Sequence, residues 1–244
     1  MNRVLLFASE LDRAGRAVLR DRRAAHLLRT LAVAPGSRVR IGVINGARGW
    51  GEVSAVSPDS VILDCRFEER EEAAGAAPVD LILALPRPKA MKRLWAPLAM
   101  LGVGRVDIVN AEKVERNYFD THWLDPTYYE PLLIEGLEQA GDTRMPAVAI
   151  HRRFRPFVED QVPALYGGHV RWVGHPGTEM RAPAWEGAAE RAVLAVGPEG
   201  GWADFELGLL QAAGFRPVSL GSRTLRTDVA CISLLTLAAA GKNA

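Results

Sequence analysis

The sequence predicts two domains, a small β domain followed by an α/β domain with a mainly parallel sheet. Three observations support this fold class. Short β-branched segments joined by turn signals occupy residues 38–67, a charged and alanine-rich segment follows at 68–78, and beyond it short apolar strands alternate with helix-length segments. The length of 244 residues also suits two compact domains better than one or three.

The first domain, residues 1–67, contains a helix and a set of strands. Residues 22–31 predict the helix, which ends near Ala34-Pro35-Gly36, a helix stop followed by a turn. Alternating segments separated by Asn45-Gly46 and Pro58-Asp59 then predict a small antiparallel sheet. Its strands are expected at 38–45, 49–57 and 60–67.

Residues 68–78 separate the two domains. This segment combines a charge run, small residues, one glycine and a closing proline, which is typical of a linker. The second domain, residues 79–244, alternates strands with helices and therefore predicts a mainly parallel sheet. Strands are expected at 80–85, 106–110, 169–173, 192–196 and 217–220, and helices at 89–101, 127–140, 203–213 and 227–240.

Composition limits the class of protein. Hydrophobic residues make up 48% and charged residues 24%, as in ordinary globular proteins, and no apolar run is long enough to span a membrane. The first residues lack the pattern of a secretory signal peptide, and two cysteines, Cys65 and Cys231, are too few for a disulfide framework or a metal cluster. We therefore expect a cytoplasmic protein that has neither a metal nor a membrane partner.

Charge is distributed unevenly along the chain. The net charge is only +1, but residues 1–67 hold 11 arginines against 6 acidic residues, a surplus of +5. Arginine suits phosphate groups, so the basic first domain favours contact with nucleic acid. A GC-rich genome would produce the same arginine content without any such function.

Three glycine-rich loops follow predicted strands of the second domain. They are GHPG at 174–177, GPEGGW at 197–202 and GSRTLRTD at 221–228. Ligands of open α/β sheets bind at the carboxyl ends of the strands, and glycine lets backbone amides approach a ligand closely, so these loops are the candidate site. None matches a Walker A loop or the GxGxxG pattern, which argues against nucleotide phosphates. Taken alone, GPEGGW more commonly indicates a tight turn that leads into a helix.

The segments AVGPEGGWADFELGLLQAAGF (195–215) and VSLGSRTLRTDVACISLLTLA (218–238) together resemble the C-terminal motifs of the SPOUT superfamily of methyltransferases. More narrowly, the chain resembles the RsmE family, the 16S ribosomal RNA uracil-N3 methyltransferases. Residues 26–43 resemble the family's first-domain pattern, and its middle motifs are matched more loosely, at residues 85–103 and 138–146. The chain departs from the family pattern at three positions, Ala99, Asn117 and Asp228.

This resemblance implies a fold, a cofactor and a substrate. The fold would be a SPOUT-type, trefoil-knotted domain with a mainly parallel sheet, preceded by a PUA-like β-barrel domain that binds RNA. The cofactor would be S-adenosylmethionine. The reaction would methylate N3 of a specific uridine in 16S ribosomal RNA of the small subunit, and the enzyme would be a homodimer, as SPOUT enzymes generally are.

The resemblance also assigns residues to the cofactor. Loops of glycine, proline and aliphatic residues suit methyl transfer from a sulfonium, because the positive charge of the donor disappears in the reaction. The residues expected to bind the cofactor are His175, Val196, Gly197, Pro198, Gly200, Gly201, Leu220, Gly221, Leu225 and Arg226.

Methylation of uridine N3 requires a group that stabilises the uridine anion or accepts the N3 proton. Arg226 and Arg144 are the candidates for the first role, and Asp228 and Glu199 for the second. Asp228 is equally suited to capping the last helix, and Glu199 to binding amides of its own loop.

Two basic clusters are candidates for RNA contact. The first lies on the predicted helix of the first domain, although a solvated basic helix face is the simpler interpretation. Its members are Arg22, Arg23, His26 and Arg29. The second follows a strand and comprises His151 with Arg152, Arg153 and Arg155.

Two other functions remain compatible with the sequence. One is a ribose 2′-O-methyltransferase on the same knotted fold, and the other is a non-catalytic RNA-binding factor of ribosome assembly. The glycines at 197, 200, 201 and 221 favour an enzyme, because a loop that no longer holds a cofactor need not stay open.

Overall fold

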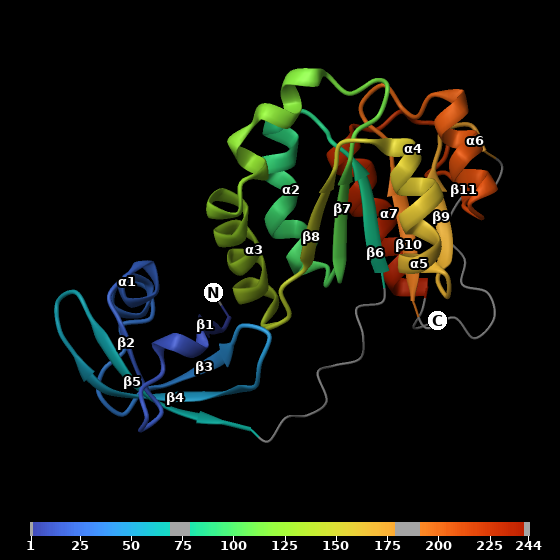
Figure 1. The fold of residues 1–244 in the computed structure, drawn as a ribbon. Coiled ribbons are helices and arrows are strands. Elements are labelled where there is room, and N and C mark those ends of the chain that lie inside the picture. The colour runs from blue at the N-terminus through green and yellow to red at the C-terminus, as the bar shows by residue number, and fades with distance from the viewer. Residues whose placement is uncertain (1, 69–78, 179–190, 242–244) are drawn as a thin grey trace. The chain divides into compact units, whose positions relative to one another are not determined.

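The structure, a computed structural model, describes residues 2–68, 79–178 and 191–241. These residues form two compact units, each of which is taken by itself (Figure 1). The first unit comprises the described residues up to 68 together with Leu137–Met145, and the second comprises the rest. The predicted linker, apart from Glu68, lies outside the described residues.

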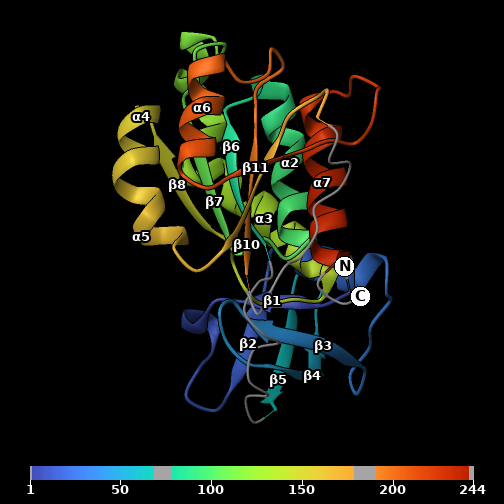
Figure 2. The same cartoon turned by 90° about the vertical axis from the view of Figure 1, so that its right-hand side faces the viewer.

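The first unit is built on a five-stranded sheet in the order β1-β3-β4-β5-β2. Its strands are β1 (Val4–Leu6), β2 (Arg16–Leu19), β3 (Arg38–Val43), β4 (Arg48–Val56) and β5 (Val61–Phe67). The predictions of β3, β4 and β5 are confirmed, whereas the short edge strands β1 and β2 were missed. The three predicted strands pair antiparallel as expected, whereas the missed strand β1 pairs with β3 in parallel. The sheet curls as a half-barrel, with β1 and β2 as its two edges (Figure 2).

Alternation along these strands gives the sheet one core face and one solvent face. Ile41, Val53 and Leu63 point into the core and are almost completely buried. Helix α1 (Arg22–Arg29) covers this core with Ala24 and Leu27. The helix begins after Asp21, whose side chain caps it by accepting a hydrogen bond from the backbone N of Arg23 at 2.9 Å.

A segment from much later in the chain completes the first unit. The backbone N of Asn45 donates to the carbonyl of Thr143 at 2.7 Å, and the backbone N of Met145 donates to Oδ1 of Asn45 at 2.8 Å. A Cβ on Gly42 would lie 2.4 Å from Cγ2 of Thr143, so the approach requires glycine at position 42. The sequence predicted Leu137–Met145 as part of the second domain, because local patterns carry no information about partners 100 positions apart.

The second unit contains a six-stranded, all-parallel sheet in the order β11-β9-β10-β6-β7-β8, which confirms the predicted α/β class. Its strands are β6 (Val79–Ala84), β7 (Arg105–Val109), β8 (Ala147–His151), β9 (Val170–Gly174), β10 (Ala192–Val196) and β11 (Arg216–Val218). β6 and β10 are buried along their whole length, as expected of central parallel strands that are covered on both faces.

Helices cover both faces of this sheet (Figure 2). On one face, α2 (Pro88–Met100) and α7 (Thr227–Gly241) pack against each other, and α7 also packs on β6 and β10. The stacked rings of Trp95 and Tyr129, whose centroids lie 4.7 Å apart, join α2 to α3 (Pro126–Ala140). The other face carries α4 (Phe154–Pro156), α5 (Val162–Tyr166) and α6 (Asp204–Ala212).

Most of these helices agree with the sequence. The predictions of α2, α3, α6 and α7 are confirmed within about two residues at each end. α4 and α5 were missed, because Pro156 and Pro163 interrupt the pattern and a π-helical turn at Phe157–Gln161 separates the two. Across the described part of the chain, no helix combines the length and the apolarity that a membrane crossing needs.

Candidate functional site

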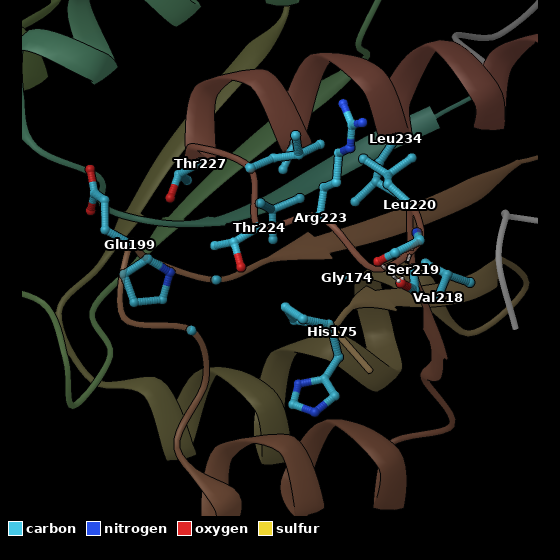
Figure 3. Close-up of a pocket in the computed structure, with 18 residues that line it drawn as sticks. Gly174, His175, Glu199, Val218, Ser219, Leu220, Arg223, Thr224, Thr227 and Leu234 are labelled. Carbon is cyan, nitrogen blue, oxygen red and sulfur yellow. Dashed lines mark hydrogen bonds between the residues drawn. The ribbon is translucent and has the colours of Figure 1, made fainter. Parts of the chain in front are cut away.

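The three glycine-rich loops line one pocket at the carboxyl edge of the parallel sheet (Figure 3). They follow β9, β10 and β11, and the start of α7 contributes Thr227, Ala230 and Leu234. The loop pocket, as we call it, has a volume of about 680 Å³, part of which is open to solvent. This position is that of a small-molecule site in an open α/β sheet.

Two glycines show why these loops need that residue. Gly221 has φ +103°, a left-handed conformation that strains any residue with a Cβ. A Cβ on Gly197 would lie 3.2 Å from the backbone N of Trp202 and 3.2 Å from its indole nitrogen. The loop after β10 therefore folds tightly back on itself, and its backbone is exposed to the pocket.

The wall of the loop pocket is mostly apolar, with Val196, Val218 and Leu234 among its side chains. Within the described chain, the backbone N–H groups of Leu220 and Leu225 donate no hydrogen bond. The pocket therefore offers apolar surface for a flat ring and amide donors for polar atoms at the edge of that ring.

A second cavity adjoins the loop pocket, and we call it the basic cleft. It has a volume of about 990 Å³, including solvent-open space. Its charged residues are Arg87, Lys89, Arg93, Glu199, Arg226 and Asp228. The residues common to both cavities are Glu199, Thr224, Leu225 and Thr227. Four cations against two carboxylates give the cleft a charge that suits a polyanion.

An ion group organises the basic cleft. Asp228 lies in the first turn of α7, and its Oδ2 accepts hydrogen bonds from Nη2 of Arg93 at 2.8 Å and from Nη2 of Arg226 at 3.1 Å. Burial alone would raise the pKa of Asp228, but the hydrogen bond from Arg93 and the charges of Arg226 and Arg93 outweigh burial and hold that pKa below its usual value. Asp228 is therefore ionised near neutral pH and is engaged by two cations.

Glu199 stands where the two cavities meet. Its side chain is exposed, and Oε1 accepts one hydrogen bond, from the backbone N of Arg87 at 3.1 Å. Of the two carboxylates in the basic cleft, Glu199 is thus the one that retains accessible lone pairs.

The structure brings most of the predicted cofactor residues together. Those that line the loop pocket are His175, Val196, Gly197, Pro198, Gly201, Leu220, Gly221 and Leu225. Arg226 lies in the basic cleft instead. Gly200 turns toward Lys113, whose Nζ donates to its carbonyl at 3.0 Å, and it is not among the residues that line the pocket.

Sequence reasoning missed the cations of α2. Arg87, Lys89 and Arg93 enter the basic cleft from the start of this helix, which begins with Pro88 after β6. A usable signal was present for Arg87 and Lys89, because these two residues closely follow a buried strand, as the three glycine-rich loops do.

The predicted RNA-binding face of α1 is only partly available. All five N–H groups of Arg23 are engaged by Asp21, Glu10 and the carbonyl of Leu5, and the residue is 7% exposed. Arg23 therefore helps to hold the first unit together and offers no free N–H group to a ligand. Arg22 pairs with Glu138 at 2.7 Å but remains half exposed. His26 is half-buried and Arg29 is exposed.

Two further predicted residues lie elsewhere. Arg144 belongs to the first unit, where it pairs with Asp142 at 3.3 Å. His151 is the last residue of β8, and its Nε2 lies 2.7 Å from Oδ1 of the fully buried Asp107, so its side chain contacts the interior of the second unit. No three His, Cys, Asp or Glu side chains gather into a metal-binding group within the described residues.

Comparison with known proteins identifies the family. A family model described as an RNA methyltransferase domain matches residues 74–239. A protein of Treponema pallidum (strain Nichols) named ribosomal RNA small subunit methyltransferase E is 30% identical over 247 residues, which cover 99% of this chain and 92% of that protein. A protein of Borreliella burgdorferi named ribosomal RNA small subunit methyltransferase E 1 is 23% identical and covers 88% of each chain.

Solved structures show the same fold. Ribosomal RNA small subunit methyltransferase E from Neisseria gonorrhoeae, bound to S-adenosyl methionine, superposes with a TM-score of 0.76 at 21% identity, covering 97% of this chain and 95% of that one. A putative methyltransferase from Legionella pneumophila in complex with the bound cofactor SAM gives a TM-score of 0.72 at 22% identity, covering 98% and 97%. With the family model and the Treponema relative both matching most of its length, the chain belongs to the RsmE family of RNA methyltransferases.

Proposed function

We propose that the protein uses S-adenosylmethionine to methylate N3 of a specific uridine in 16S ribosomal RNA of the small subunit. The observation that carries this proposal is the loop pocket opening beside the basic cleft, because the first suits a small apolar donor and the second suits an RNA strand. The names of the relatives support the substrate. We propose further that the second unit is a trefoil knot and that the enzyme acts in the cytoplasm as a homodimer.

The residues of the loop pocket fit S-adenosylmethionine. When bound, this molecule supplies an electrophilic methyl group on a positively charged sulfur. Leu220 and Leu225 would bind its adenine, with aliphatic side chains against the ring and backbone amides at its edge. Glu199 is the one carboxylate among the residues that line the pocket, so little negative charge stabilises the sulfonium before it reacts.

Uridine N3 must lose its proton before it can attack a methyl group. We assign Glu199 as the general base that accepts this proton. Its exposed carboxylate lines both cavities and accepts only one hydrogen bond, from the backbone amide of Arg87. Asp228 is less suited, since two arginines occupy it and its pKa is lowered.

The uridine anion needs positive charge near its carbonyl oxygens. We assign this task to Arg226, whose side chain is 71% exposed. Arg93 lies beside it, because both arginines pair with the carboxylate of Asp228. Asp228 then acts by holding both guanidinium groups in place. Arg144, in the first unit, remains the second candidate for this charge.

The reaction product tests the proposal. We would incubate the purified chain with methyl-labelled S-adenosylmethionine and unmodified small ribosomal subunits and analyse the nucleosides by mass spectrometry. N3-methyluridine is the expected product. A methyl group on ribose would instead support a 2′-O-methyltransferase, and absence of product together with absence of cofactor binding in calorimetry would support a non-catalytic RNA-binding factor.

A variant tests the role of Glu199. We expect Glu199→Gln to lower kcat by about 10²- to 10⁴-fold, as for loss of a general base, with the affinity for S-adenosylmethionine changed by less than about threefold. The rate of the variant should recover as pH rises, because uridine then loses its proton unaided. Glu130→Gln, at an exposed position on α3, is the matched control. An unchanged kcat in Glu199→Gln would exclude this residue as the base.

A further inference from the structure

Trp50 is unusually placed for a tryptophan. Trp95, Trp172 and Trp202 are 0 to 4% exposed, but Trp50 on β4 is 37% exposed. It lies on the solvent face of the first unit's sheet, since its neighbours Gly49 and Gly51 are buried on the opposite side. A large aromatic ring left in water is typical of a surface that binds a partner.

Strand register builds a row of cations around this ring. Arg40 on β3 and Arg66 on β5 are the direct cross-strand partners of Trp50, so the three side chains form one row across adjacent strands. The next row contains Arg38, Glu52 and Asp64. Strands lie about 4.8 Å apart, so the cations at the ends of the first row have backbones roughly 10 Å apart with the ring between them.

The contacts of these residues keep the arginines on the ring. The Cζ atoms of Arg38 and Arg40 lie 5.2 and 5.6 Å from the centroid of the Trp50 ring, within the range of cation–π contact. In the described chain, Arg38, Arg40 and Arg66 form no ion pair with a carboxylate, unlike Arg23 on α1. Their charge is thus available to a ligand.

A shallow hollow of about 430 Å³, including solvent-open space, lies at the same place. It is lined by Trp50, by Arg38 and Arg66, and by the carboxylates Glu52 and Asp64. Carboxylates beside an aromatic ring can accept hydrogen bonds from the amino groups of a base, and arginines can bind phosphate. We call this set, together with Arg40, the Trp50 platform.

We propose that the Trp50 platform binds an unpaired nucleotide of the RNA substrate, with the base stacked against Trp50 and its arginines and the flanking phosphates held by Arg40 and Arg66. The inference deepens the proposed function and rests on it. The combination of ring, cations and carboxylates favours single-stranded RNA, because duplex bases are not open to stacking on a side chain. It also moves the RNA contact of the first unit from α1 to the sheet.

Binding of a labelled oligonucleotide tests the platform. With the full-length chain and a fluorescein-labelled single-stranded RNA of mixed sequence, we expect Trp50→Ala to weaken binding about 5- to 100-fold in fluorescence anisotropy. Trp50→Phe should stay within about threefold of the unchanged protein, because it keeps a ring. A circular dichroism melt shows whether Trp50→Ala still folds, and Trp50→Phe keeps the test decisive if it does not.

Salt dependence separates the two faces of the first unit. We expect the double substitution Arg40→Ala and Arg66→Ala to reduce the slope of log affinity against log salt by about 1.4, which corresponds to two phosphate contacts on a single strand. Arg29→Ala, at an exposed arginine of α1, tests the alternative RNA-binding face and should leave the slope unchanged. The opposite pattern, with Arg29→Ala effective and Trp50→Ala silent, would overturn the platform.

Methyl transfer then distinguishes failure of the platform from failure of the proposed function. Trp50→Ala should raise the KM for ribosomal RNA with kcat unchanged. Transfer that proceeds with the same KM in Trp50→Ala overturns the platform alone. RNA binding that depends on Trp50 without any methyl transfer overturns the proposed function alone. A polyglutamate peptide that binds as tightly as RNA, with the same dependence on Trp50, would replace RNA by an acidic protein partner.

Discussion

At the residue scale, Asp228 holds two arginines in the basic cleft. Its side chain is 9% exposed, whereas those of Arg93 and Arg226 are 51% and 71% exposed. A carboxylate that is nearly buried while its partners reach into solvent acts as an anchor for them. Shortening or neutralising this anchor should therefore affect the cleft more than the fold.

We expect Asp228→Asn to lower the free energy of unfolding by about 1 kcal/mol at pH 7, a figure reduced for the exposure of its partners. Because the pKa of Asp228 is lowered on folding, its contribution is present above the unfolded value near 3.8 and is lost as pH falls through the folded value. Urea unfolding at pH 7 and pH 3 measures the difference, which should shrink at pH 3. A difference that grows on acidification would contradict the assignment.

For Glu138, the dependence of stability on pH has the opposite sign. Burial raises the pKa of Glu138, although the hydrogen bond and the charge of Arg22 oppose the shift, and its Oε1 has no hydrogen-bond partner in the described chain. When folding raises the pKa of a carboxyl group, the folded protein becomes less stable as pH rises and the group ionises. We therefore expect Glu138→Gln to match or exceed the unchanged protein in thermal stability at pH 8, and to lose that advantage at pH 4. At each pH, the melting temperature of the unchanged protein is subtracted from that of Glu138→Gln. A difference that is smaller at pH 8 than at pH 4 would refute this prediction.

At the element scale, the loops after β9, β10 and β11 depend on backbone shape more than on side chains. The backbone N of His175 donates to the carbonyl of Val218 at 2.9 Å and so ties the first loop to the last strand. Gly221 adds a left-handed turn just beyond that strand. The shape of the pocket therefore depends on backbone contacts within the protein.

Gly221→Ala should disturb this geometry. A Cβ at φ +103° costs about 1–3 kcal/mol of strain, so we expect the loop to shift and the affinity for S-adenosylmethionine to fall at least tenfold. Calorimetric titration measures the affinity. Gly168→Ala is the matched control, because a Cβ there meets nothing within 4 Å and its φ is not positive. Equal affinities in the two variants would show that the turn at 221 does not shape the pocket.

The elements also show what local pattern can and cannot predict. β10 and the loops beside it were predictable, because a buried apolar run followed by glycines has a single common explanation in an α/β sheet. The cations of α2 were missed, because the sequence does not show that the fold of α7 places Asp228 2.8 Å from Arg93. The ion pairs of Arg23 could not be predicted for the same reason, because the sequence does not reveal that Glu10 and Asp21 enclose this residue.

At the scale of the whole molecule, the chain does not divide at a single point. Leu137–Met145 belongs to the first unit although 61 residues of the second unit, Ala76–Gly136, precede it. Arg48 pairs with Asp142 at 2.9 Å, and Arg22 with Glu138 at 2.7 Å, so the segment is held by charge as well as by backbone hydrogen bonds. No linker pattern in the sequence marks the point at which the chain comes back to the first unit.

A fragment of residues 1–68 should therefore be unstable. It lacks the partners of Gly42 and Asn45, and it leaves Arg22 and Arg48 without their carboxylates. We expect amide hydrogens of β3 to exchange at least 100-fold faster in this fragment than in the full chain, measured by hydrogen exchange with mass spectrometry. Equal protection of β3 in both would show that the later segment is dispensable.

The return of Leu137–Met145 also has a consequence for the order of events during synthesis. The first unit cannot be completed when residue 68 leaves the ribosome, because its last piece is translated roughly 4 to 15 s later, at about 5–20 residues per second. Until then Gly42 and the turn at Asn45 have no covering segment. The N-terminal unit is thus the first to be started and cannot be finished until the strands β6 and β7 of the other unit have already been made.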